Sequence, residues 1–257
     1  MFNDFGSDLR RGDAVARLVY ECVFLSDDGL GYSDNEDVCF VEYPKDSSLQ
    51  YAGADIVVFP GKNRECLVEV KSAVDSAGPR AKSGLPLGTF AHELLYRNDK
   101  RELKPGWFVD TRKRSDVYLY CWIPVVRREL QREPGVPYYR IREIGDIGVL
   151  EVAIVEVRRL LEYIDRELFG EETEHSEAVI KDALLTKAKQ MRTSGCQSNR
   201  IGKFRVIFSK SLKEEPVNLL IPKKDLRELA FRAFKIKQMT YSSDPARIEW
   251  AVTRWDD

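Results

Sequence analysis

The sequence predicts a mixed α/β fold, and three observations lead to this class. Hydrophobic residues make up 43% of the 257 positions, which is enough apolar material for a folded core. Apolar residues near the N-terminus recur at helical spacing, whereas the segments that follow are short apolar runs typical of strands. The predicted order is a helix, a cluster of strands, helices, strands and a final helix, which is a mixed α/β pattern.

The N-terminal part is predicted to hold one helix and a β-hairpin. Residues 13–25 place their apolar side chains on one stripe, as in an amphipathic helix. Short strands are predicted at 38–43, 54–59 and 65–72. The last two strands are joined by residues 60–64, a turn containing Pro, Gly and Asn, so they are expected to pair antiparallel.

The remainder is predicted to alternate between helices and strands. Residues 117–126 form the most apolar run in the chain and are expected to be a central strand. A composition shift near residue 170 suggests a core over residues 1–170 and a C-terminal α/β extension with a basic segment over 171–257, which stays compatible with one continuous domain. The other predicted elements are helices at 89–96, 153–168, 177–191 and 224–236 and strands at 138–144, 204–208 and 217–221.

Composition excludes several classes of protein. The 41 basic and 42 acidic residues give a net charge of −1, so the chain is neither a highly basic packaging protein nor an acidic tail. Two histidines and no Cys-x-x-Cys pair exclude a structural zinc site. The five cysteines have no close pairs and are predicted to be reduced thiols: Cys22, Cys39, Cys66, Cys121 and Cys196.

The sequence shows neither a secretory signal nor a membrane span. The first residues carry two acids and no apolar stretch typical of a secretory signal. No apolar run reaches the roughly 18 residues that a membrane span requires. The sequence therefore predicts a soluble, cytoplasmic protein without membrane contact.

One group of charged residues stands out within the predicted hairpin. Side chains of a strand alternate between faces, so Glu69 and Lys71 point the same way while Val68 and Val70 point to the other face. With the turn centred near residue 62, Asp55 opposes Glu69 across the hairpin. The pattern therefore predicts that Asp55, Glu69 and Lys71 converge at one end of the hairpin.

This arrangement predicts a divalent metal site. Two carboxylates held close together repel each other unless a cation lies between them. Mg²⁺, or Mn²⁺ in its place, suits the oxygens of Asp55 and Glu69 together with the backbone carbonyl of Val70. Lys71 beside such an ion is expected to orient or deprotonate a water molecule, or to stabilise charge on a phosphate. The alternative is a surface hairpin whose exposed Glu–Lys pair contributes little.

An aspartate, a hairpin turn and then Glu-x-Lys within apolar strands resembles the core of the PD-(D/E)xK nuclease superfamily. The resemblance covers about a quarter of the chain and implies a restriction-endonuclease-like mixed central β-sheet flanked by helices. It also implies Mg²⁺-dependent cleavage in which Asp55 and Glu69 bind the metal and Lys71 acts on the attacking water. Members often carry a further glutamate on a preceding helix, and Glu21 is the best-placed acid for that role.

Two positions depart from the family pattern. Ala54 precedes Asp55, where the family motif has proline, a position that varies widely. The Gln-x-x-x-Tyr motif of RecB-type members does not follow the lysine strand, which argues against that branch.

Basic residues are concentrated in two segments. Residues 181–213 hold nine basic residues and one acid, and residues 97–114 hold seven basic residues, three acids and the aromatic pair Trp107 and Phe108. Such segments suit contacts with phosphates and bases, although solvated helix faces and core aromatics are equally ordinary explanations. The predicted nucleic-acid contacts are Lys100, Arg101, Lys104, Arg112, Lys113, Arg114, Lys187, Lys189, Arg192, Arg200 and Lys203.

The sequence therefore predicts a Mg²⁺-dependent nuclease that hydrolyses phosphodiester bonds, with DNA as the expected substrate. RNA and a homodimeric assembly stay open. One alternative is a catalytically silent nucleic-acid-binding or assembly protein that keeps the nuclease fold. Another is an unrelated α/β interaction protein in which the three charged residues coincide by chance.

Overall fold

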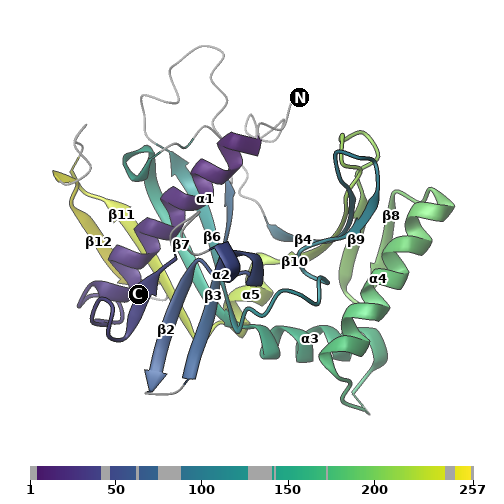
Figure 1. The fold of residues 1–257 in the computed structure, drawn as a ribbon, viewed down its shortest axis with the longest axis horizontal. Coiled ribbons are helices and arrows are strands. Elements are labelled where there is room, and N and C mark those ends of the chain that lie inside the picture. The colour runs from purple at the N-terminus through teal and green to yellow at the C-terminus, as the bar shows by residue number, and fades with distance from the viewer. Residues whose placement is uncertain are drawn as a thin grey trace. The chain divides into compact units, whose positions relative to one another are not determined.

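The structure, a computed structural model, describes residues 5–41, 47–61, 64–74, 88–126, 141, 143–171, 173–240 and 247–255 (Figure 1). It is mixed α/β, as predicted. The chain divides into two compact units. Unit 1 comprises Met1–Leu87, Ser115–Val155 and Ala230–Asp257, and unit 2 comprises Gly88–Arg114 and Glu156–Leu229.

Unit 1 is built on a seven-stranded mixed sheet with the order β1-β2-β3-β6-β7-β11-β12. The pairs β1–β2, β2–β3, β7–β11 and β11–β12 are antiparallel, whereas β3 and β6 run parallel. The strands are β1 (Val38–Phe40), β2 (Ile56–Gly61), β3 (Arg64–Val74), β6 (Val117–Val126), β7 (Ile147–Glu156), β11 (Arg232–Gln238) and β12 (Trp250–Arg254).

One long helix covers a face of this sheet. It begins as α1 (Phe5–Val19) and continues as the π-helix η1 (Tyr20–Leu25), and Figure 1 shows α1 crossing the strands of unit 1. Its buried side chains, among them Leu18, share a core with Val68 of β3 and Leu119 of β6. The predicted helix over 13–25 is therefore confirmed, because its apolar stripe is what the sheet buries. Two short helices, α2 (Ser47–Ala52) and η3 (Ile144–Asp146), complete the unit.

Unit 2 combines an antiparallel sheet, of order β5-β4-β10-β9-β8, with three helices. In β10 the residues Val217, Leu219 and Ile221 are fully buried and alternate with less buried ones, which is the pattern of a strand covered on one face. The elements are β4 (Thr89–Arg97), β5 (Leu103–Pro105), β8 (Ser198–Ile201), β9 (Phe204–Phe208), β10 (Val217–Pro222), α3 (Val157–Phe169), α4 (Glu177–Ser194) and α5 (Lys223–Leu229).

The central strand at 117–126, the strands at 204–208 and 217–221 and the helix at 177–191 are confirmed, but three predicted helices are wrong in whole or in part. Residues 89–96 form strand β4, in which Phe90 and His92 are buried opposite β10. The helix predicted over 153–168 begins only at Val157, because residues 152–155 form a buried part of β7. The helix predicted over 224–236 ends at Leu229 and gives way to β11. The strand predicted at 138–144 lies largely outside the described residues, and its last residue, Ile144, begins η3.

The division into units also differs from the predicted one. The expected boundary near residue 170 lies between α3 and α4, inside unit 2. Each unit is assembled from separate stretches of the chain, so a single cut along the sequence does not describe them.

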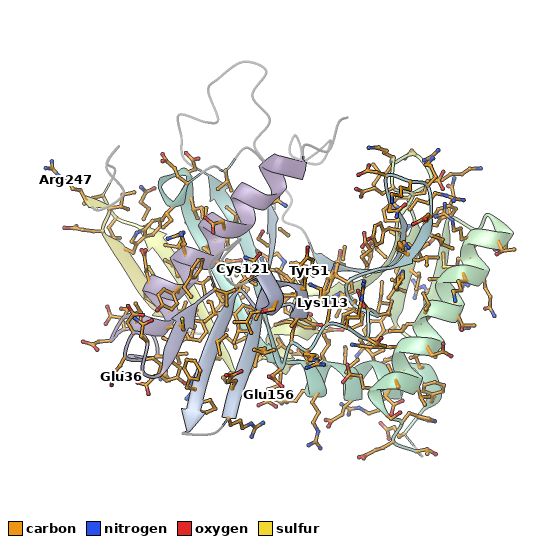
Figure 2. All side chains as sticks on the ribbon, viewed as in Figure 1. Glu36, Tyr51, Lys113, Cys121, Glu156 and Arg247 are labelled. Carbon is orange, nitrogen blue, oxygen red and sulfur yellow. The ribbon has the colours of Figure 1, made fainter. Side chains whose placement is uncertain are left out.

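Two further expectations concern cysteines and membranes. All five cysteines are free thiols, with Cys22 and Cys121 buried and Cys196 exposed. Figure 2 labels Cys121, which lies in β6 and belongs to the core of unit 1. Among the helices in the described ranges, none is long and apolar enough to cross a membrane.

Candidate functional site

The hairpin that carries the predicted site has the register that the sequence suggests. Val57 pairs with Leu67 and Ile56 with Val68, and the register shifts only near the turn, between Val58 and Gly61. The ladder ends at the pair of Ile56 and Val68, so Asp55 and Glu69 are the next residues of the two segments beyond it. That their side chains face each other stays a prediction.

Asp55 lies immediately before β2 and is fixed by both its backbone and its side chain. Its amide donates to the carbonyl of Val68 (2.8 Å), and its own carbonyl accepts from the amide of Val41 (3.0 Å). Its carboxylate oxygen Oδ2 accepts a hydrogen bond from the amide of Val70 (2.7 Å). Asp55 is thereby joined to β3 beyond the point where the pairing of β2 and β3 ends.

The backbone of Val70 is presented at the same edge. Its amide points toward Asp55, and in a β-strand the carbonyl of a residue points to the same side as its amide. Pairing with β2 extends only to Val68, so the carbonyl of Val70 lies beyond the end of that ladder. The predicted neutral ligand thus lies on the edge that Asp55 occupies.

The side chains of Glu69 and Lys71 point to one face of β3, and those of Val68 and Val70 point to the other face. The Nζ atom of Lys71 lies 2.5 Å from Oε1 of Glu69, and the Glu69 side chain is only 6% exposed. A buried carboxylate of this kind is costly unless it is paired and hydrogen-bonded. The ammonium group of Lys71 supplies one of the partners that Glu69 requires.

The surroundings of this pair are apolar and aromatic. Val57, Phe59 and Leu67, which share the face of Glu69, form a small core cluster. In β6 the residues opposite Glu69 and Lys71 are Tyr118 and Tyr120, both buried. Burial, with smaller contributions from Tyr118 and Glu69, raises the pKa of Tyr120 well above its ordinary value, so this phenol stays protonated. The site is therefore no exposed surface hairpin.

Glu21, the predicted additional carboxylate, has a different environment. It lies on η1, and its neighbours in that helix pack against the face of the sheet that carries Val68, across β3 from Glu69. Partial desolvation raises the pKa of Glu21, and nearby Arg17 counteracts this effect. The membership of Glu21 in a metal site stays a prediction.

The donor atoms at the hairpin are chemically suited to a hard cation. Asp55 and Glu69 each offer carboxylate oxygens, and the carbonyl of Val70 is a neutral oxygen ligand of the type that Mg²⁺ accepts. Within the described ranges, no group of three or more His, Cys, Asp and Glu side chains is gathered closely enough to hold a metal ion. The proposed set contains two such side chains and one backbone oxygen.

Two functional neighbours were not identified from the sequence. The hydroxyl of Ser115 lies 2.9 Å from Oε2 of Glu69 and 3.0 Å from the carbonyl of Gly53, so it links Glu69 to the segment that leads into Asp55. Asp116 binds Leu67 twice, because its amide donates to the Leu67 carbonyl and its carboxylate accepts from the Leu67 amide. The only available signal was a Ser-Asp pair directly before the predicted central strand.

All eleven residues predicted to contact nucleic acid belong to unit 2. Arg192 is 10% exposed and forms an ion pair with Glu215, and Lys203 forms ion pairs with Glu167 and Asp225, so these two take part in structural contacts. Arg112 and Lys104 pair with acids at the surface. The exposed members are Lys100, Arg101, Lys104, Arg112, Arg114, Lys187, Lys189, Arg200 and Lys203.

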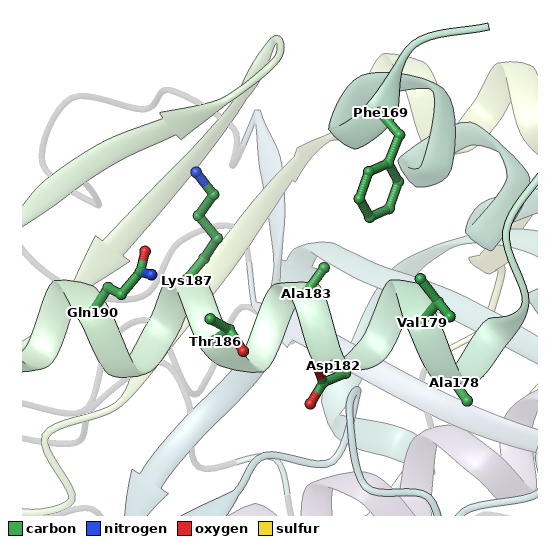
Figure 3. A pocket seen from close by; sticks show the side chains of 8 residues that line it. All are labelled: Phe169, Ala178, Val179, Asp182, Ala183, Thr186, Lys187 and Gln190. Atoms are coloured by element: carbon green, nitrogen blue, oxygen red, sulfur yellow. The ribbon is translucent and has the colours of Figure 1, made fainter. Parts of the chain in front are cut away.

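Unit 2 also contains a shallow hollow of about 590 Å³. Figure 3 shows its lining, which consists of Phe169 at the end of α3 and one side of α4 from Ala178 to Gln190. Asp182 and Lys187 are the charged residues at its margin. The hollow contains none of the hairpin residues, so it is a separate feature of the molecule.

Comparison with protein-family models, curated proteins and solved structures gave no match to the chain. The geometry of the hairpin is therefore the main basis for proposing a role.

Proposed function

We propose that the protein is a Mg²⁺-dependent nuclease of restriction-endonuclease-like fold that hydrolyses phosphodiester bonds, with DNA as its substrate. One observation carries the proposal. The Asp55 carboxylate accepts a hydrogen bond from the Val70 amide of β3, and Glu69 and Lys71, the residues on either side of Val70, form a largely buried ion pair. This is the residue set of the superfamily that the hairpin resembles.

The residues divide the chemistry between them. Asp55, Glu69 and the carbonyl of Val70 would hold Mg²⁺. A bound Mg²⁺ supplies charge stabilisation at the phosphate and lowers the pKa of a coordinated water. Lys71 would release Glu69, and its ammonium group would then orient water or stabilise negative charge on the phosphate. Ser115 keeps Glu69 in position while Lys71 changes partner.

The fold supports the assignment in a general way. A helix covers one face of a mixed sheet, and Glu69 and Lys71 lie on β3, an interior strand that pairs with β6 at both residues and with β2 as far as Val68. Free cysteines are typical of a reducing compartment such as the cytoplasm, where we place the protein.

The test is a cleavage assay with linear duplex, single-stranded and branched DNA in Mg²⁺ or Mn²⁺. Asp55→Asn, Glu69→Gln and Lys71→Ala are each expected to abolish cleavage. Glu65→Gln is the matched control, because Glu65 is an exposed acid on the same strand. Cleavage that survives in Asp55→Asn and Glu69→Gln, or no metal-dependent cleavage by the unaltered chain on any substrate, would contradict the proposal.

One observation favours a second candidate, a nucleic-acid-binding protein without catalysis. The closed Glu69–Lys71 ion pair is an internally satisfied arrangement that requires no metal. Metal titration separates the two candidates: a nuclease binds Mn²⁺ and loses that binding in Asp55→Asn, whereas the silent protein binds DNA without taking up metal at Asp55.

A further inference from the structure

Helices α3 and α4 pack against one face of the sheet of unit 2. The ring of Phe208 lies 5.2 Å from the guanidinium of Arg192 on α4, and the ring of Phe204 lies 5.3 Å from that of Tyr163 on α3. Because strand residues alternate, the intervening residues of β9 point to the other side. We name this second side the open face, and its side chains include those of Tyr96, Lys104, Arg200, Arg205, Ile207 and Leu220.

The strand register brings basic residues from distant parts of the chain to this face. Arg205 on β9 is directly opposite Arg200 on β8 and opposite Leu220 on β10. At the other edge of the same sheet, Tyr96 on β4 is opposite Lys104 on β5. Residues directly opposite each other in an antiparallel pair share a face.

One irregularity decides the direction of Tyr96. The pairing of β10 with β4 shifts register between Val217 and Asn218, and Leu94 and Leu95 are both buried there. A bulge of this kind sets two successive residues against one partner and returns Tyr96 to the face of Glu93. Glu93, the acid on the open face, contributes to the raised pKa of Tyr96, after the larger effect of burial.

The two arginines form an unusual pair. Like charges directly opposite each other destabilise a sheet. Nε of Arg205 donates to Ser198 Oγ (3.1 Å), but across the part of the chain that the structure describes, neither guanidinium forms an ion pair with a carboxylate. Both side chains are exposed. An anion bound between the two guanidinium groups would relieve this repulsion.

We propose that the open face binds the phosphodiester backbone of a nucleic acid through Arg200 and Arg205. Planar guanidinium groups match phosphate oxygens in pairs, and Tyr96 offers a ring on which an unpaired base can stack. The proposal rests on the proposed function for its choice of polyanion. It assigns substrate contact to Arg205, which the sequence did not single out, and it gives Arg192 and Lys203 structural roles instead.

The test measures binding without catalysis. Fluorescence anisotropy of labelled single-stranded and duplex oligonucleotides is recorded with the full chain in EDTA. Arg200→Glu/Arg205→Glu is compared with Arg158→Glu/Arg159→Glu, which changes the net charge equally at two exposed residues of α3, a helix whose Tyr163 contacts Phe204 on the opposite face. The open-face variant is expected to bind at least about tenfold more weakly, and the α3 variant to bind unchanged.

A milder pair of variants separates phosphate contact from a structural role. Arg200→Lys/Arg205→Lys is expected to keep most of the affinity, and Arg200→Ala/Arg205→Ala to reduce the salt dependence of binding by about one or two phosphate contacts. Circular dichroism checks that each variant is folded.

Three results would overturn the inference: equal losses in the open-face and α3 variants, unchanged affinity in the open-face variant, and no binding by the unaltered chain. If the arginines only protect the edge strand β8 from pairing with another chain, Arg200→Glu/Arg205→Glu would bind with unchanged affinity and Arg200→Ala/Arg205→Ala would aggregate. Failure of the proposed function is distinguishable from failure of this inference. In that case the unaltered chain binds the oligonucleotides in EDTA but shows no metal-dependent cleavage.

Discussion

The amide of Val70 donates to the carboxylate of Asp55 over 2.7 Å, which joins the first acid of the hairpin to the backbone of the residue between Glu69 and Lys71. This contact gives Asp55 a structural role in addition to its proposed role as a metal ligand. The two roles are separable, because an amide oxygen accepts the same hydrogen bond but is a weaker ligand for Mg²⁺.

We predict that Asp55→Asn and Asp55→Ala differ in stability while sharing the loss of cleavage. Asn keeps an acceptor for the Val70 amide, whereas Ala leaves that amide without one, at a cost of about 1–3 kcal/mol in the free energy of unfolding. Urea denaturation of both variants measures the difference. Equal stabilities would mean that water replaces the carboxylate at this edge.

Ser115→Ala is expected to reduce cleavage and to lower the free energy of unfolding by about 1 kcal/mol, because Glu69 loses a hydrogen-bond donor. Ser115→Thr keeps the hydroxyl and should restore both properties. A positioning role predicts that the metal concentration required for half-maximal cleavage rises in Ser115→Ala. If stability falls while the metal dependence is unchanged, Ser115 acts on the fold alone.

Thiol reactivity should separate the cysteines by burial. Burial raises the pKa of Cys22 to about 12 and raises that of Cys121 further, so at pH 8 both are protonated as well as inaccessible. Only a thiolate reacts rapidly with iodoacetamide. Exposed Cys196 is expected to be alkylated first in the native protein, as mass spectrometry of the digested protein can show. Early modification of Cys121 would contradict the core of unit 1 described above.

The ion pairs of Glu215 predict a pH dependence of stability. Hydrogen bonding to Arg97, aided by Arg192, lowers the pKa of Glu215. A lowered pKa in the folded state stabilises the protein above the ordinary glutamate pKa, and that contribution is lost as the pH falls through the folded-state value. Glu215→Gln should therefore be less stable than the unaltered chain at pH 7, with a smaller difference at pH 3.5. Thermal unfolding at both pH values checks this, and a difference that does not shrink would contradict it.

The hairpin could be predicted from the sequence because its determinants are local. The short turn and the period-two alternation of Leu67 to Lys71 predict the pairing of Val57 with Leu67, which the structure has. Ser115 could not be predicted in the same way, because its position follows from the parallel pairing of β3 with β6, strands that lie far apart in the sequence.

The errors in secondary structure have a related cause. In β4, the segment containing Phe90 and His92 has short-range features compatible with a helix, and only its pairing with β10 defines it as a strand. In β7 the run from Val152 to Val155 is buried on both faces, so no alternation marks it as a strand. The open face of unit 2 could not be predicted either, because β4 and β9 contribute to it from two separate stretches of the chain, Gly88–Arg114 and Glu156–Leu229.

The discontinuous build of unit 1 has a consequence for the newly made chain. Strand β7 pairs with β11, yet about 75 residues of unit 2 lie between them in the sequence. At a synthesis rate of about 5–20 residues per second, roughly 4–15 seconds separate the emergence of β7 from that of its partner. During that interval the apolar edge from Val152 to Val155 is open to pairing with other chains. Chaperone protection, or early folding of unit 2 on the ribosome, would guard the nascent protein against aggregation at this strand.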